Sequence, residues 1–280
     1  MMRDLKGKVV VVTGAASGIG REMALAFARR GSRLVVADID EEGLRLAEEE
    51  LKTMGEEVRS KVIDVSVAGQ VETFCEDLYE EIGRVDVLCN NAGVAVAGWM
   101  EDQSLDDWTW ILGVNLWGVI HGCYYFYPRM IEQGGGGHIV NTASGAGLIP
   151  LPLTISYNTT KYAVVGLSET LRAEAALNGI GVSVLCPGFV ATPITNNAVY
   201  VSRTERSNTE ELQGKIDRFF KRRNYTPNKV AEAVIKGVED NRAVIVVGPE
   251  TYLGDFTHRL SRRLYDSVLG LATRLMRERL

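Results

Sequence analysis

The feature that most constrains the fold is a repeated alternation of short apolar runs with amphipathic helical patterns along most of the chain. The apolar runs are rich in valine, isoleucine and leucine and show little in–out alternation, which is typical of strands buried on both faces. Repetition of strand and helix predicts one parallel sheet with helices on both sides. The predicted strands are Lys8–Thr13, Arg33–Asp38, Val58–Ile63, Val85–Cys89, His138–Thr142, Gly181–Cys186 and Ala243–Val247.

The intervening segments predict helices, and the whole predicts an α/β domain with a doubly wound, parallel, seven-stranded sheet over residues 1–250. An open sheet of this kind binds its ligand at the carboxyl ends of its strands. Residues that directly follow a strand are therefore the candidates for function. The predicted helices are Gly18–Arg30, Glu41–Met54, Ala68–Ile82, Asp106–Ile131 and Ser156–Asn178.

Two segments depart from this pattern. Residues 189–225 are polar and charged, with a helix expected around Thr209–Arg222, and we interpret them as a lid over the site; an ordinary surface insertion is the alternative. Residues 251–280 predict a basic amphipathic extension, which would pack on a neighbouring subunit, lie on a membrane surface or form a loosely ordered tail. Its apolar positions are Leu260, Leu264, Val268, Leu271 and Leu275.

Composition narrows the class of protein. Hydrophobic residues make up 46% and charged residues 24%, as in ordinary globular proteins. The net charge of −5 argues against nucleic acid as a partner, because phosphate binding requires a basic surface. The four cysteines form no C-x-x-C pair, and with three histidines no metal-ligand cluster is visible. We expect buried, reduced thiols and a cytoplasmic protein, and the first apolar run reads as a strand, not a signal peptide.

A glycine-rich turn follows the first strand. It reads T-G-A-A-S-G-I-G, Thr13 to Gly20, and its glycine spacing differs from the dinucleotide motif G-x-G-x-x-G. A tight glycine turn that opens onto a helix N-terminus still offers backbone N–H groups and a helix dipole to a pyrophosphate. The sequence therefore predicts a dinucleotide site formed by Gly14, Ser17, Gly18, Ile19 and Gly20.

Acidic residues end the second and third strands. Asp38 lies 18 residues beyond Gly20, where a carboxylate accepts hydrogen bonds from ribose hydroxyls and repels a 2′-phosphate. No cation lies inside the glycine turn, so NAD is favoured over NADP. Asp64, followed by Val65, is placed to reach the adenine edge. The alternative for each aspartate is an N-cap, of the helix near Glu41 and of the helix from Ala68 respectively.

Tyr157 and Lys161 in Y-N-T-T-K share one face of a predicted helix. Tyrosine has a pKa near ~10, and an adjacent ammonium should lower the pKa of Tyr157 and make it an acid/base. This spacing alone is common and mostly structural. Ser144, after the fifth strand, adds a hydroxyl for a substrate oxygen, and Asn115 lies in an apolar helical stretch where it could anchor a water near Lys161.

Together these residues resemble the single-domain branch of the short-chain dehydrogenase/reductase family. The resemblance implies a Rossmann fold and a homotetramer or dimer, which would pair the helices after Asp106 and at Ser156–Asn178. It further implies that Lys161 holds the nicotinamide ribose, that Asn91, Ala92 and Gly93 border the adenosine side, and that Val190 and Thr192 hold the carboxamide. The matching pieces are Thr13–Gly20, Asp38, Asp64, N-N-A-G at 90–93, Asn115, Ser144, Tyr157, Lys161 and P-G-F-V-A-T at 187–192, which includes Pro187 and Gly188.

The predicted function is hydride transfer between NAD and the carbinol or carbonyl carbon of a hydrophobic secondary alcohol or ketone. The alternatives are reduction of an acyl-thioester ketone or of a C=C or C=N bond, and a binding protein that holds the dinucleotide without turnover. An apolar substrate is expected because the residues predicted to face it are apolar. These are Val94, Val96, Trp99, Gly145 to Pro152 and Phe189.

Overall fold

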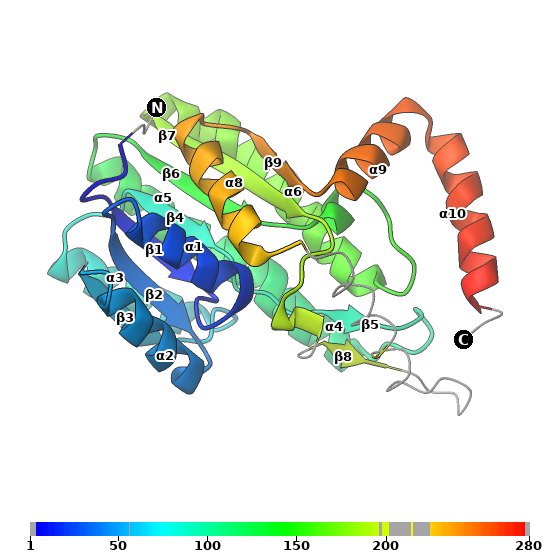
Figure 1. Cartoon of the computed structure of the whole chain (residues 1–280), viewed down its shortest axis with the longest axis horizontal. Coiled ribbons are helices and arrows are strands. Elements are labelled where there is room, and N and C mark those ends of the chain that lie inside the picture. The colour runs from blue at the N-terminus through cyan, green and yellow to red at the C-terminus, as the bar shows by residue number, and fades with distance from the viewer. Residues whose placement is uncertain (1–3, 56, 196–197, 202–213, 215–224, 278–280) are drawn as a thin grey trace.

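The computed structural model describes residues 4–55, 57–195, 198–201, 214 and 225–277. At its centre lies a seven-stranded sheet in the order β3-β2-β1-β4-β6-β7-β9, in which every neighbouring pair is parallel (Figure 1). The seven predicted strands are confirmed, with ends that differ by at most two residues. Their bounds are β1 Val9–Thr13, β2 Arg33–Asp38, β3 Val58–Val62, β4 Val87–Asn90, β6 Gly137–Thr142, β7 Ile180–Pro187 and β9 Val244–Val247.

Helices cover both faces of the sheet and give the protein two apolar cores. On one face, α1 (Gly18–Ala28), α2 (Glu41–Lys52) and α8 (Pro227–Glu239) pack against alternate residues of the central strands. On the other, α3 (Ala68–Glu81), α5 (Gly118–Glu132) and α6 (Ile155–Ala175) do the same. All five residues of β1 are therefore buried, which explains its unbroken run of four valines.

The long helix predicted over Asp106–Ile131 is interrupted. It begins as α4 (Leu105–Leu112), where Ser104 and Asp107 form a reciprocal capping box. A π-helical turn, Gly113–Trp117, separates α4 from α5. Such turns are frequent at functional sites because they redirect side chains that a regular helix would misplace. Here the redirected side chain is Asn115, which is completely buried.

Several elements were not predicted. Helix α8 has proline at its first position, and a two-stranded parallel sheet joins β5 (Val96–Ala97) to β8 (Val199–Tyr200). Beyond β9, α9 (Pro249–Leu260) and α10 (Arg262–Arg277) are separated by the extended residue Ser261, so the predicted amphipathic extension is two helices. The helix predicted around Thr209–Arg222, and most of the predicted lid, lie outside the described residues.

Two further expectations concern the surroundings of the chain. All four cysteines are buried and free of disulfides, as predicted. Within the part of the chain that the structure describes, no helix is both long and apolar enough to cross a bilayer.

Candidate active site

The carboxyl ends of β1, β4 and β6 lie together where the strand order reverses between β1 and β4. The side chain of Asn91 joins these ends: its Nδ2 donates to the carbonyls of Thr13 (3.0 Å) and Gly14 (3.3 Å), and its Oδ1 accepts from Thr142 (3.3 Å). The Thr13 hydroxyl accepts in turn from the amides of Asn91 and Ala92. Asn91 therefore holds β1, β4 and β6 together and shapes the site through the backbone.

The glycine turn is built for close approach. Gly14 has a φ of 67°, and a Cβ there would lie 2.7 Å from the Ala92 Cα. Helix α1 begins at Gly18, and Ser17, at the N-cap, makes no side-chain capping bond. The amides of the first turn are thus not closed off by Ser17, and the turn fits a pyrophosphate. Thr192, from the loop after β7, lies against Gly18: a Cβ added to Gly18 would lie 3.4 Å from the Thr192 Cβ.

Asp38 is tied to this turn. One carboxylate oxygen accepts from the Ala16 amide (2.9 Å) and the other from the Asp40 amide (3.0 Å). The N-cap of α2 is Asp40, whose side chain accepts from Gly43, so the alternative reading of Asp38 as a helix cap is wrong. Because each carboxylate oxygen has a second lone pair, Asp38 can still accept hydrogen bonds from a ligand.

The alternative reading of Asp64 is also wrong. Its carboxylate accepts from the amide (2.9 Å) and hydroxyl (2.7 Å) of Ser66, whereas the N-cap position of α3 belongs to Val67, which makes no side-chain bond. Val65 is buried, and its carbonyl contacts the His121 ring nitrogen at 2.9 Å. This segment therefore fixes the end of β3 against α5.

Helix α6 places Lys161 one turn after Tyr157, as predicted. The Lys161 Nζ lies over the Tyr157 ring, 5.5 Å from its centre, and donates to the Thr142 carbonyl at 3.0 Å. Lys161 is only 3% exposed. Burial lowers the pKa of Lys161 to about 8, because removing the ammonium from water costs free energy. The bond to the Thr142 carbonyl holds the ammonium in place.

The pKa of Tyr157 does not follow the sequence prediction. Burial raises the pKa of Tyr157, a hydrogen bond with Ser144 opposes the rise, and the nearby Cys186 adds to it. The i, i+4 spacing predicts an ammonium nearby but not the loss of hydration, which disfavours phenolate and ammonium alike. The Lys161 ammonium by itself therefore does not bring the pKa of Tyr157 below its ordinary value.

Ser144 and Asn115 complete the cluster. Ser144 follows β6 and caps a short 3₁₀ turn, Gly145–Gly147, accepting from the Ala146 amide. The amide of Asn115 bonds both backbone groups of Val94, at 2.8 and 2.9 Å, and donates to Thr160 at 3.3 Å. A Cβ on Gly93 would lie 3.2 Å from Asn115 Oδ1 and 3.6 Å from Lys161 Nζ. The four predicted catalytic residues thus come together at the strand ends.

The residues predicted to face the substrate divide into two groups. Val96 lies in β5 and is completely buried, and residues 145–148 are buried too, so these do not offer side-chain surface to a substrate. Val94, Trp99 and Phe189 and the stretch 149–152 remain partly exposed. The partly exposed residues, Val94, Trp99, Phe189 and 149–152, still form a mainly apolar surface for a substrate.

Sequence reasoning missed the support that the C-terminal segment gives to the loop after β7. At the start of α9, Glu250 accepts from the Phe189 amide at 3.1 Å. Thr251 is 2% exposed, and its hydroxyl oxygen lies 2.9 Å from where a Cβ on Gly145 would be and 2.7 Å from where one on Gly188 would be. This loop includes Gly188 and Val190 and follows Pro187, the last residue of β7. No motif signals such a contact, because it joins segments about 60 residues apart.

We expect the wild type to gain stability relative to Lys161→Met as the pH rises from 8 toward 10. The pKa of Lys161 is about 8 in the folded protein and about 10.4 in an unfolded chain. Between these pH values the unfolded state binds more protons than the folded state, so the free energy of unfolding rises with pH. Below pH 8, Lys161 is protonated in both states, and its contribution to the free energy of unfolding is constant. Urea unfolding at pH 7 and pH 9.5 measures this; an unchanged difference between the proteins would contradict the burial of the ammonium.

Comparison with known proteins agrees with this geometry. Residues 8–200 match the model of the short chain dehydrogenase family. The "Probable oxidoreductase EphD" of Mycobacterium tuberculosis is 40% identical over 245 residues, 87% of this chain, and the chain spans only 41% of that protein's length. The "CLA biosynthesis dehydrogenase/reductase" of Lactiplantibacillus plantarum is 36% identical over 259 residues, covering 89% of this chain and 91% of that protein.

Among solved structures, a short-chain dehydrogenase/reductase from Burkholderia phymatum in complex with NAD superposes with a TM-score of 0.86. It is 34% identical, and the match covers 93% of this chain and 96% of that one. The fold, the strand-end cluster and these matches agree with one another. The chain belongs to the short-chain dehydrogenase/reductase family of oxidoreductases.

Proposed function

We propose that the protein transfers a hydride between NAD and the carbinol or carbonyl carbon of an apolar secondary alcohol or ketone. The observation that carries this proposal is the meeting of Tyr157, Ser144, Lys161 and Asn115 beside the glycine turn. When bound, the nicotinamide would accept the hydride in oxidation and supply it in reduction. Gly14, Ser17, Gly18, Ile19 and Gly20 would hold the pyrophosphate, and Asp38 the ribose hydroxyls.

In this proposal Tyr157 exchanges the proton. During oxidation its phenolate oxygen takes the proton of the substrate hydroxyl, and during reduction its hydroxyl returns a proton to the carbonyl oxygen. Ser144, within hydrogen-bonding range of Tyr157, orients the same oxygen. Lys161 holds a positive charge over the Tyr157 ring and favours the phenolate. Asn115 positions the backbone of Val94 beside them.

NAD, in preference to NADP, is supported by Asp38. Its carboxylate is fixed by the Ala16 and Asp40 amides, so it cannot swing away from a 2′-phosphate without losing both bonds. The next residue, Ile39, is exposed and supplies no cation. The Burkholderia phymatum relative was solved with NAD, which is consistent with this preference.

An apolar substrate is supported by the partly exposed side chains of Val94, Trp99 and Phe189 around the cluster. We expect turnover of apolar secondary alcohols with NAD, followed at the absorbance of the reduced cofactor, to exceed that of polyols by about tenfold or more, because a pocket of apolar side chains cannot satisfy additional hydroxyls. Preferred turnover of polyols would contradict the substrate class.

Two other outcomes would support the alternative functions. Reduction confined to acyl thioesters, C=C or C=N bonds would assign the protein to another reaction of the family. NAD binding without any turnover would make it a binding protein.

A homo-oligomer is part of the proposal. The α4–α5 segment exposes Trp110, Trp117, Tyr124 and Ile131, spaced seven residues apart, and α6 exposes Ile155 and Tyr162. Several large apolar side chains exposed on neighbouring helices favour burial against a second copy. Light scattering during size-exclusion chromatography gives the mass of the assembly.

A further inference from the structure

Exposed apolar surface is concentrated in α9 and α10, which we call the C-terminal arm (residues 249–277). Of the 22 large apolar side chains that are exposed among the described residues, eight lie in this arm, and α10 has no buried residue. Soluble monomers rarely leave such a contiguous patch uncovered unless it binds something. The eight are Tyr252, Leu253, Phe256, Leu260, Leu264, Val268, Leu271 and Leu275.

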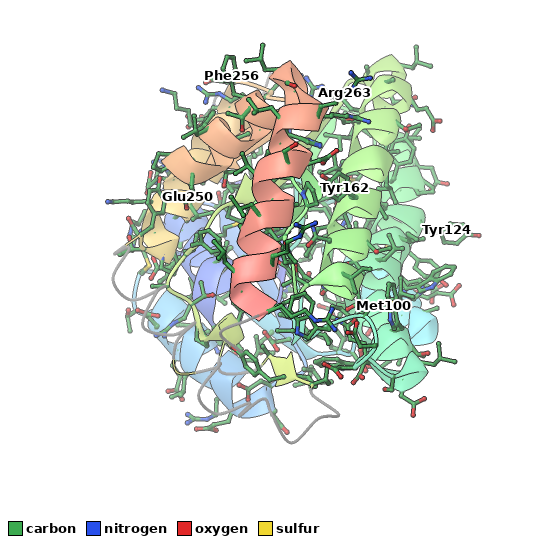
Figure 2. All side chains as sticks on the ribbon, turned by 90° about the vertical axis from the view of Figure 1, so that its right-hand side faces the viewer. Met100, Tyr124, Tyr162, Glu250, Phe256 and Arg263 are labelled. Carbon is green, nitrogen blue, oxygen red and sulfur yellow. The ribbon has the colours of Figure 1, made fainter. Side chains whose placement is uncertain are left out.

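One face of α10 is already held by the rest of the protein. Near its start, the Tyr265 hydroxyl donates to the Pro150 carbonyl at 3.3 Å. At its end, Arg277 pairs with Glu101 at 2.7 Å and lies over the ring of Trp99. The helix therefore has a fixed orientation, and Figure 2 shows it running along the outside of the molecule.

Among the described residues, none covers the apolar stripe on the side of α10 away from Arg277. Leu264, Val268, Leu271 and Leu275 recur at helical spacing and are 47–63% exposed. They lie about a quarter turn around the helix from Tyr265. The anchors at both ends orient α10 so that this stripe faces outward in the structure.

Arginines without an internal counter-charge adjoin the stripe. Arg263 and Arg274 are exposed and have no ion pair within the described ranges, whereas Arg259 pairs with Asp255 and Arg277 with Glu101. Arg263 and Arg274, three turns apart, share one face of α10. In a chain with a net charge of −5, unpaired cations gathered beside an apolar stripe complement an anionic partner.

We propose that the C-terminal arm binds the surface of an anionic lipid membrane. An amphipathic helix with leucines on one face and arginines beside them lies in the interface, with its apolar side chains among the acyl chains. Arginine side chains reach from such a helix to the lipid phosphates. Each arginine near an anionic surface strengthens binding, and salt weakens that contribution.

This surface lies close to the candidate active site. The two anchors of α10 are the loop after β5, at Trp99 and Glu101, and the loop that follows Ser144, at Pro150. If the proposed function holds, a membrane-bound arm would bring the site beside a lipid phase in which apolar alcohols and ketones dissolve. Binding to the membrane itself does not depend on that function.

The test is co-sedimentation of the full chain with vesicles of phosphatidylcholine alone and of phosphatidylcholine with phosphatidylglycerol at 3:1, in low and high salt. We expect binding to the anionic vesicles that falls as salt rises. Leu264→Ser with Leu271→Ser should reduce the bound-to-free ratio about tenfold or more, and Arg263→Gln with Arg274→Gln about tenfold. Leu177→Ser is the matched control, because Leu177 is 88% exposed and lies in the short 3₁₀ turn Ala176–Asn178, which follows α6 and precedes the amino end of β7.

The outcomes separate the occupants of the stripe. Wild-type protein that stays in the supernatant with both vesicles overturns the proposal, as does equal, salt-independent binding to neutral vesicles. If the two leucine substitutions instead lower the molar mass by light scattering, a second copy covers the stripe, and the proposal is wrong. NAD turnover of each variant, measured without vesicles, shows whether the proposed function stands independently.

Discussion

Tyr157→Phe is expected to lower kcat for oxidation by about 10³-fold while NAD binding stays within about twofold of the wild type. The substitution removes the oxygen that exchanges a proton with substrate, and a positioned acid/base contributes roughly 10²–10⁴-fold to a rate. It leaves the aromatic ring, over which Lys161 lies, in place. Steady-state kinetics with saturating NAD, together with fluorescence titration of the cofactor, measures both quantities.

Tyr162→Phe is the matched control for this experiment. Tyr162 lies on the same helix, is 39% exposed and belongs to no part of the cluster. Its loss of a hydroxyl should leave kcat unchanged. Wild-type activity in Tyr157→Phe would remove the proposed acid/base, and equal losses in both variants would assign the effect to the helix instead of the phenol.

The second large effect is on the choice of cofactor. We expect Asp38→Ser to shift the ratio of kcat/KM values for NAD and NADP by about a hundredfold toward NADP. The substitution removes a charged acceptor of ribose hydrogen bonds, each worth roughly 1.5–3 kcal/mol, and the repulsion of a 2′-phosphate. Serine can still accept from the Ala16 amide, so the glycine turn keeps one of its supports.

Asp40→Ser controls for a general loss of charge at the end of β2. Asp40 caps α2 by accepting from the Gly43 amide, and serine caps helices nearly as well. The NAD preference of this variant should equal that of the wild type. A preference unchanged in Asp38→Ser, or changed equally in both variants, would contradict the role given to Asp38.

The sheet could be predicted because its strands are buried on both faces. The unbroken valine run of β1 is typical of a strand buried on both faces, and the glycine turn after it indicates the edge where ligands bind. The association of Tyr157 with Lys161 and Ser144 follows from helix spacing and from the position of Ser144 just after a strand. These predictions needed only local patterns and one rule of topology.

What could not be predicted depends on contacts between distant segments. The π-helical turn at Asn115 has no composition of its own; it occurs where the Asn115 amide bonds Val94, a residue about 20 positions earlier. Thr142 supports Lys161 through a backbone carbonyl, which any residue type supplies. The raised pKa of Tyr157 arises from burial by the whole fold. Likewise the packing of Thr251 against Gly145 joins residues that no motif connects.

The proposed proton exchange requires charge beside Tyr157 to offset burial, which raises the pKa of this phenol. The most direct measurement is the phenolate absorbance of the wild type minus that of Tyr157→Phe, titrated against pH with and without saturating NAD. We expect the Tyr157 pKa to lie above its ordinary value without NAD and to fall when the positively charged nicotinamide ring binds. A Tyr157 pKa that NAD leaves unchanged, in an enzyme that still oxidises its alcohol, would contradict the account.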